Sequence, residues 1–337
     1  MQHNFVQCDL GTQTHSVMFY DERSQGKGAD ACCSMRMLYQ LRKLKILRDK
    51  GLKPEEEVSL MILMDNCTGQ NKSRVVIQFF GLLSLLYKRV LLFYFIRGHT
   101  KMIADRVVAL WRSAIRQFNL YSLEDIIGKV RNVESLVPEI IRNTEESSQC
   151  LAGWDHVLTK HIKKLPSGYS KNYYFEIEDG IVNFKYIATT PNNNALSFVI
   201  YKDKVETRQQ LLEELFGHSD LTKLEFSTLS LSKAERLKLS KKKLKSLGRK
   251  YLTIPKKYLQ SYPKLSDELT KEVEKEKEDG LEMEKLQNEI KRKRGRKRRK
   301  NSKNPKKRKV GRPRKIKIKV EDPSQRDLRF FFSRNIE

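Results

Sequence analysis

Two continuous apolar segments, 58–64 (VSLMILM) and 90–96 (VLLFYFI), restrict the fold more than any other feature of the sequence. Such runs are typical of strands buried on both faces of a sheet. The segment between them, 73–87, is apolar nearly all round and predicts a deeply buried helix. Lys88 and Arg89 interrupt the apolar zone, and its pieces are too short to span a bilayer. We therefore expect two sheet strands joined by a helix.

The flanking segments extend this pattern. Residues 4–9 and 15–20 predict strands on either side of a turn-like segment, and residues 31–47 carry apolar side chains near the helix period. A further helix is expected after the second apolar run, ending near Phe118. The order β-β-α-β-α-β-α predicts the α/β class, with a mixed sheet flanked by helices.

The rest of the chain is more polar. Residues 154–165 predict a helix, and two strands, 173–177 and 181–187, meet at Asp179-Gly180, which is a hairpin signal. Pro255, Pro263 and Gly280 are expected to interrupt a charged helical region. We divide the chain into a core (1–125), a mixed α/β extension (126–230), the charged helical region (231–290) and a disordered basic tail (291–337).

Charge is concentrated in the tail. Of the net charge of +27, residues 291–315 contribute +17, from 17 Lys and Arg and no acid, so the other residues carry 27 − 17 = +10. Such blocks are typical of nucleic-acid arms or nuclear addresses. The five cysteines have no spacing that would bind zinc, and they fit reduced thiols in a nuclear or cytosolic protein.

Two carboxylates are the main candidates for chemistry in the core. Asp65 ends the first apolar strand, and Asp105 lies in the first turns of the helix after the second. Ligands of α/β sheets collect beyond the carboxyl ends of the strands, where two carboxylates can hold Mg²⁺ or Mn²⁺ for phosphodiester cleavage. His99 lies between them and could orient water or contact phosphate. The alternative is that Asp65-Asn66 and His99-Thr100 only cap helices.

Two strings carry a family resemblance: MDNCTGQNKSR (64–74) and RGHTKMIADRVVALW (97–111). They resemble a transposon-derived family with an RNase H-like DDE core, and the likeness is weaker elsewhere between residues 1 and 265. The resemblance implies that Asp65 and Asp105 are the second and third metal carboxylates. The first is expected on the first strand of a three-strand meander.

The first carboxylate is the open question. Asp9 is the local candidate, but its surroundings look more like the second strand of that pattern. One expectation is therefore a complete site of Asp9, Asp65 and Asp105. The other is a core without its first strand, in a truncated or domesticated element or an incomplete gene model.

The tail contains two overlapping motifs. Residues 310–315 (VGRPRK) resemble an AT-hook, in which an extended Gly-Arg-Pro core lies in the minor groove of A·T tracts. The candidate DNA-binding residues are Arg294, Arg296, Gly311, Arg312, Pro313, Arg314 and Lys315. Residues 304–310 resemble a nuclear localisation signal, which a nuclear import receptor would bind through Pro305, Lys306, Lys307, Arg308 and Lys309. Both motifs predict a nuclear protein.

The C-terminal segment resembles a PCNA-interacting peptide. Gln325, Leu328, Phe331 and Phe332 have the QxxhxxFF spacing, and one helical turn would gather the three apolar side chains into a plug. An alternative is that these aromatic side chains pack on the protein's own core.

Two functions follow from these patterns. One is a transposase-derived nuclear DNA-binding protein that retains Mg²⁺-dependent cleavage or strand transfer. The other is an inactive chromatin or replication scaffold that binds AT-rich DNA and the sliding clamp. A ribosome-biogenesis factor that prefers RNA is a third interpretation.

Overall fold

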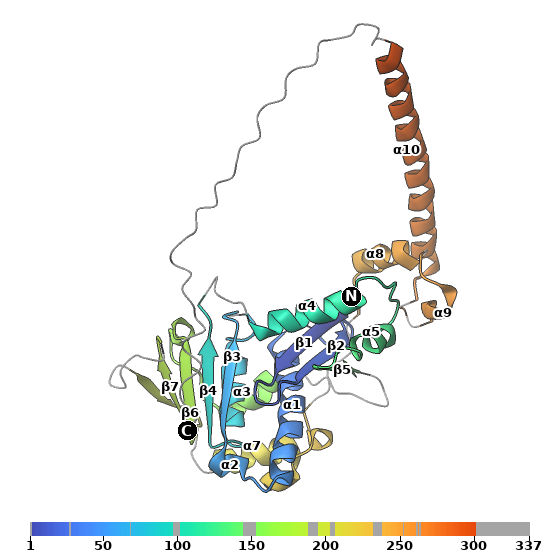
Figure 1. Cartoon of the computed structure of the whole chain (residues 1–337). Coiled ribbons are helices and arrows are strands. Elements are labelled where there is room, and N and C mark those ends of the chain that lie inside the picture. Colours follow the sequence, from blue (N-terminus) through green and yellow to red (C-terminus); the bar gives the residue numbers. More distant parts are fainter. Residues whose placement is uncertain are drawn as a thin grey trace, which may run out of the picture. The chain divides into compact units, whose positions relative to one another are not determined.

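The computed structural model describes residues 2–26, 28–67, 69–96, 102–143, 153–187, 195–202, 206–231, 238–251, 253–260, 262 and 264–300. The chain divides into two compact units, Met1–Val273 and Glu274–Glu337. All strands described below belong to the first unit (Figure 1).

The first sheet has three strands, β1 (Gln2–Cys8), β2 (His15–Asp21) and β5 (Leu136–Ile141), in the order β1-β2-β5. β1 and β2 form an antiparallel hairpin, and β5 runs parallel to β2. Alternate residues of β2 point to opposite faces, which are both covered. Val17 and Phe19 pack with α4 (Ile103–Ile115) and α5 (Leu123–Val130), whereas Met18 and Tyr20 pack with α1 (Ala29–Asp49).

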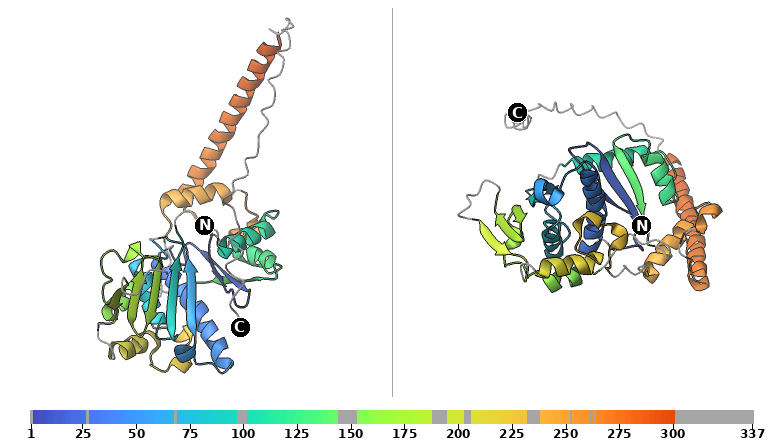
Figure 2. Two further views of the ribbon diagram at one scale, coloured as in Figure 1. Left: turned by 60° about the vertical axis from the view of Figure 1, so that its left-hand side comes forward. Right: turned by 90° about the horizontal axis from the view of Figure 1, so that it is seen from below.

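The second sheet has five strands in the order β3-β4-β6-β7-β8. Their bounds are β3 (Ser59–Met64), β4 (Arg89–Tyr94), β6 (Tyr174–Glu178), β7 (Ile181–Lys185) and β8 (Leu196–Val199). β3 and β4 are parallel, and each later neighbour pairs antiparallel. Figure 2 shows this sheet from two further directions.

The largest hydrophobic core lies between this second sheet and the helices that pack on it. It contains side chains from α1, α3 (Arg74–Leu83), α6 (Trp154–His161) and α7 (Glu206–Phe216). The remaining helices of the described chain are α2 (Pro54–Glu57), α8 (Lys241–Tyr251), α9 (Lys256–Leu259), α10 (Asp267–Lys300) and the 3₁₀ turns Tyr169–Lys171, Leu221–Lys223 and Phe226–Thr228. None of the described helices is both long and apolar enough to cross a membrane.

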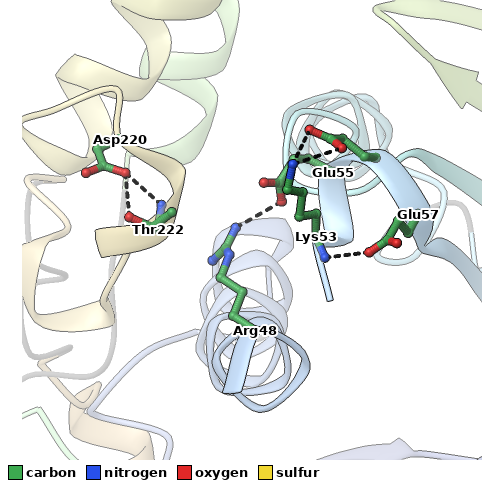
Figure 3. A network of polar contacts seen from close by, with 7 residues as sticks. Arg48, Lys53, Glu55, Glu57, Asp220 and Thr222 are labelled. Atoms are coloured by element: carbon green, nitrogen blue, oxygen red, sulfur yellow. Dashed lines mark hydrogen bonds and ion pairs between the residues drawn. The ribbon is translucent and has the colours of Figure 1, made fainter. Parts of the chain in front are cut away.

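Polar contacts fix the path from α1 into the second sheet (Figure 3). Arg48 near the end of α1 reaches Glu55 of α2 at 3.4 Å, and the Lys53 amide donates to Glu57 at 2.7 Å. Nearby, the Asp220 carboxylate accepts from the Thr222 amide at 2.9 Å. The end of α1 therefore lies beside the start of β3, because α2 leads directly into that strand.

The mixed α/β class is confirmed, with two mixed sheets flanked by helices. The predicted order of the first strands and helices is also confirmed, with the short α2 added before β3. The turn at Asp179-Gly180 connects β6 to β7, and both residues have positive φ (47° and 71°), as a two-residue hairpin of the I′ type requires.

Three predictions about single elements are wrong. β3 is not buried on both faces, since Met61 is 58% and Leu63 41% exposed. The helix after Gly153 ends at His161 rather than Leu165. Gly280 does not interrupt a helix, because α10 continues through it to Lys300, past the expected boundary at 290.

Candidate functional site

The loop after β3 has its own internal hydrogen bonds. The Cys67 carbonyl accepts from the amides of Gln70 (3.2 Å) and Lys72 (3.0 Å). Ser73 then caps α3, because its hydroxyl accepts from the Val76 amide at 3.4 Å. The alternative that Asp65-Asn66 caps this helix is therefore wrong.

Side chains beneath the loop hold it in place. Lys72, 1% exposed, donates to Asn66 Oδ1 at 3.1 Å. Arg36 of α1 donates to Asn71 Oδ1 at 2.9 Å, and the Tyr94 hydroxyl donates to the Asn71 carbonyl at 2.9 Å. These contacts tie the loop to α1 and β4, and so they fix where β3 ends.

Asp65 is the residue that this loop presents outward. It is exposed, and no described residue forms a hydrogen bond with its carboxylate; its carbonyl accepts from Asn71 Nδ2 at 3.4 Å. Asp65 follows the carboxyl end of β3, which is parallel to its neighbour β4. This is the position where α/β proteins bind ligands, and the Asp65 carboxylate is not occupied by a contact within the protein.

Asp105 lies in the first turn of α4. Its Oδ2 accepts a hydrogen bond from the Met102 amide at 2.9 Å and so caps the start of the helix. Its other carboxylate oxygen has no protein partner in the described residues. Met64, next to Asp65, and Met102–Ala104, next to Asp105, line one cavity of about 550 Å³. The structure thus brings the immediate chain neighbours of the two predicted carboxylates to the same cavity.

Asp9 lines another part of that cavity and is fully engaged. Its carboxylate pairs with Lys43, accepts from Tyr39 at 3.3 Å and accepts from the amides of Gly11 (2.9 Å) and Thr12 (3.1 Å). Burial alone would raise the pKa of Asp9, but the Lys43 ammonium and these amides outweigh it and hold that pKa below its usual range. Asp9 is therefore a charged partner of α1 in this structure.

The described residues contain no group of three His, Cys, Asp or Glu side chains placed to hold a metal ion. Mg²⁺ does not require such a group, since it is often held by one or two carboxylates and keeps several waters. Asp65 and the free oxygen of Asp105 are the donors that fit this chemistry. His99, the remaining predicted site residue of the core, lies outside the described residues.

The thiols of the described chain are free at Cys8, Cys32, Cys33 and Cys67. Burial raises the pKa of Cys8 to about 11 and the pKa of Cys33 well above its usual value. The Cys8 and Cys33 thiols are therefore protonated at neutral pH, and a protonated thiol is a poor nucleophile and a poor metal ligand.

Sequence reasoning assigned no role to Arg36, Asn71 or Lys72, and it considered Asn66 only as part of a helix cap. Three of these four residues stand in the NCTGQNK string, which was interpreted as a polar bend and as part of the family resemblance. Consecutive amide and basic side chains directly after an apolar strand were the available signal, because such groups must find partners when the loop packs on the core.

The predicted tail residues are mostly outside the described chain. Arg294 and Arg296 belong to α10. The AT-hook residues 311–315, the nuclear localisation residues 305–309 and the clamp-binding residues Gln325, Leu328, Phe331 and Phe332 lie beyond residue 300.

Fold and site together define a mixed α/β protein with two carboxylates at a strand end and a helix start. Residues 11–189, more than half of the 337, match a family described as a domain of unknown function, DUF7869, and the chain belongs to that family. No curated protein and no solved structure matches the chain.

Proposed function

We propose that this chain is a transposase-derived nuclear DNA-binding protein whose core holds Mg²⁺ or Mn²⁺ at Asp65 and Asp105. The observation that carries the proposal is the loop after β3. In this loop, Asn66, Asn71 and Lys72 form hydrogen bonds within the protein, whereas the Asp65 carboxylate is exposed and has no protein partner in the described chain. The DNC-x-GQNK and GHT-x4-D strings and the α/β order support the resemblance to RNase H-like DDE transposases.

The bound metal would activate water or a 3′-hydroxyl for attack on a DNA phosphodiester. In this chain, Asp65 and the free oxygen of Asp105 would hold the ion. Asn66 and Asn71 would keep the strand end in place, since an outer shell of hydrogen bonds commonly orients metal ligands.

The basic segments would hold the DNA. α8 presents Lys and Arg side chains and has no acidic residue, and the 17 cations of residues 291–315 add sequence-independent phosphate contacts. The AT-hook-like residues 311–315 would prefer A·T tracts. Import through residues 305–309 would place the protein in the nucleus, and the 325–332 segment would bind the PCNA sliding clamp.

A second candidate is a catalytically inactive scaffold that binds AT-rich DNA and the clamp. Two observations favour it: Asp9 is occupied by Lys43, and Asp105 uses one oxygen at the helix start. This scaffold would keep the fold and the tail and would bind no metal at Asp65.

Mn²⁺-dependent plasmid nicking tests the catalytic proposal. We expect Asp65→Asn to reduce nicking by about 100-fold or more, because the metal loses a charged ligand. Asp49→Asn, which changes another exposed carboxylate at the end of α1, is the matched control and should keep full nicking. Mn²⁺ binding measured by electron paramagnetic resonance should weaken in parallel. If the unaltered chain and Asp65→Asn bind Mn²⁺ equally, neither of them nicks the plasmid and both still bind DNA, the result would instead support the scaffold.

The AT-hook proposal predicts two separable effects of charge removal. Replacing Arg312 and Arg314 by Ala should lower the slope of log K against log salt by about two and abolish the preference for A·T duplex. Replacing Lys306 and Lys307 by Ala removes the same charge and should change only the slope. A fluorescence anisotropy titration of AT-rich and GC-rich duplexes at several salt concentrations measures both. An unchanged A·T preference in the arginine variant would rule out the AT-hook.

A further inference from the structure

The two sheets present facing open edges. In the described chain, β1 pairs only with β2 and β3 pairs only with β4, so each is the last strand of its sheet. The unbroken runs Phe5–Gly11 and Leu60–Met64 line the same cavity of about 550 Å³. Alternate residues of a strand point to opposite faces of the sheet. A cavity that is lined by consecutive residues of a strand must therefore lie along the edge of that strand. The cavity is therefore a groove between the edges of β1 and β3.

Helix α1 shows how these edges are directed. Arg36 lies over the Phe5 ring of β1 and contacts Met64 at the end of β3. Seven residues later, about 10 Å along the helix axis, Lys43 pairs with Asp9 just after β1. Arg48 then reaches Glu55, which precedes β3. β1 thus follows the direction of α1 and β3 opposes it, so a strand between them would pair parallel with one and antiparallel with the other.

The exposed side chains of β3 that line the groove are apolar. Met61 and Leu63 are 58% and 41% exposed, whereas Leu91, the β4 residue in register with Met61, is 8% exposed. Open apolar edges promote unwanted pairing, and proteins usually shorten, charge or cover them. An edge strand that is apolar from Leu60 to Met64 and lines the same groove as a second open edge is suited to accept a further strand.

Arg36 supplies the chemical preference of the groove. Its side chain is buried, 7% exposed, and lines the groove. Nη2 is bonded to Asn71, but Nη1 has no hydrogen-bond partner in the described chain, and no described carboxylate pairs with this guanidinium. A buried charge without a counter-charge is costly, and a carboxylate is the group that matches a guanidinium best.

We propose that the groove binds an extended segment of a partner polypeptide, six or seven residues long, apolar and with one carboxylate that pairs with Arg36. The segment would add a strand between β1 and β3 and so join the two sheets. Its length follows from the six and seven residues of β3 and β1. Main-chain hydrogen bonds to both edges would supply affinity, and the carboxylate would set specificity.

The chain's own tail is a poorer occupant. Residues 315–320 (KIKIKV) alternate as a strand does, with Ile316 and Ile318 on one face. The same register would place Lys317 and Lys319 in a groove already lined by Arg36 and Lys43. Like charges in one groove repel, so the positive charge of Arg36 and Lys43 favours an acidic partner.

A labelled, end-blocked peptide, Thr-Val-Ile-Asp-Val-Val-Thr, added to the full chain tests the proposal by fluorescence anisotropy. We expect saturable binding, and binding at least tenfold weaker for the same peptide with Asn in place of Asp. Arg36→Met should remove this difference between the two peptides. Met61→Ser should weaken binding about tenfold, whereas Leu196→Ser on the edge strand β8, where the side chain is 60% exposed, should leave it unchanged.

Several results would overturn the proposal. They are no binding to the unaltered chain, equal affinity for the Asp and Asn peptides, or equal weakening by Met61→Ser and Leu196→Ser. If Arg36→Met does not fold, as judged by circular dichroism, the comparison of the two peptides on the unaltered chain decides. A full chain with Ile316→Ser and Ile318→Ser that binds the peptide more tightly would assign the groove to the tail and also overturn it.

Discussion

Replacing Trp154 by Ala is expected to lower the free energy of unfolding by about 4 kcal/mol, the size typical of removing a large buried aromatic side chain. Trp154 is fully buried at the start of α6, and its ring meets Phe79 of α3 edge to face at 5.1 Å. Its indole N–H also donates to the Ser34 hydroxyl of α1 at 3.0 Å. One side chain therefore joins three helices of the largest core, and its loss leaves a cavity that rigid neighbours cannot fill.

The second tryptophan provides a matched control. Trp111 is also buried, but its indole N–H has no hydrogen-bond partner among the described residues. We expect Trp154→Phe to cost about 1–2 kcal/mol more than Trp111→Phe, because the first leaves the Ser34 hydroxyl without its donor while the second removes an unsatisfied N–H. Urea unfolding followed by far-ultraviolet circular dichroism measures both. Equal losses would show that the Ser34 hydrogen bond does not stabilise the core.

Local sequence patterns were sufficient for most of the first unit. Strand and helix periods predicted the order from β1 to α4, and Asp179-Gly180 predicted the β6–β7 hairpin because positive φ is a local requirement. β5 was not predicted, and Pro138 in its centre is an unfavourable residue for a strand. It is tolerated because β5 is the last strand of its sheet and pairs on one side only.

The exposed face of β3 could not be predicted from its own residues. A continuous apolar run has the same appearance whether one face of the strand or both are covered, and the covering of each face depends on how the rest of the chain packs on the sheet. Gly280 was misjudged for a different reason. A single glycine costs a helix only about 1 kcal/mol, which the long, charged α10 tolerates.

In the candidate site, too, some residues were predictable from the sequence and others were not. Asp65 and Asp105 were candidates because both follow apolar strands in the sequence, and in the structure the residues next to each of them line one cavity. The buried cations were not. The buried position of Lys72 depends on its cation–π contact with Tyr173, about 100 residues away along the chain. The buried position of Arg36 depends on its hydrogen bond to Asn71, which lies in the loop after β3. Nothing in the local sequence distinguishes such a lysine or arginine from a solvated one.

Lys72→Ala is expected to destabilise the first unit by about 3 kcal/mol through lost packing and lost cation–π contacts. Its ammonium lies 4.8 Å from the ring centroid of Tyr94 and 4.7 Å from that of Tyr173, in a site that is 1% exposed. Burial raises the pKa of Tyr94, so this phenol stays neutral and the ring and its hydroxyl keep their roles. The same ammonium bonds Asn66, next to Asp65, and thus connects the core to the candidate metal ligand.

Lys72→Met separates packing from charge. Met retains most of the volume, and an apolar side chain in place of a buried ion is commonly neutral for stability, so we expect a loss below about 1.5 kcal/mol. Mn²⁺ binding should nevertheless weaken by about tenfold, because Asn66 no longer has the partner that holds it beside Asp65. Chemical unfolding and Mn²⁺ titration of the two variants measure these effects. Equal stability of the Ala and Met variants would contradict the packing role, and unchanged Mn²⁺ affinity in a folded Met variant would show that the buried lysine supports the fold without orienting Asp65.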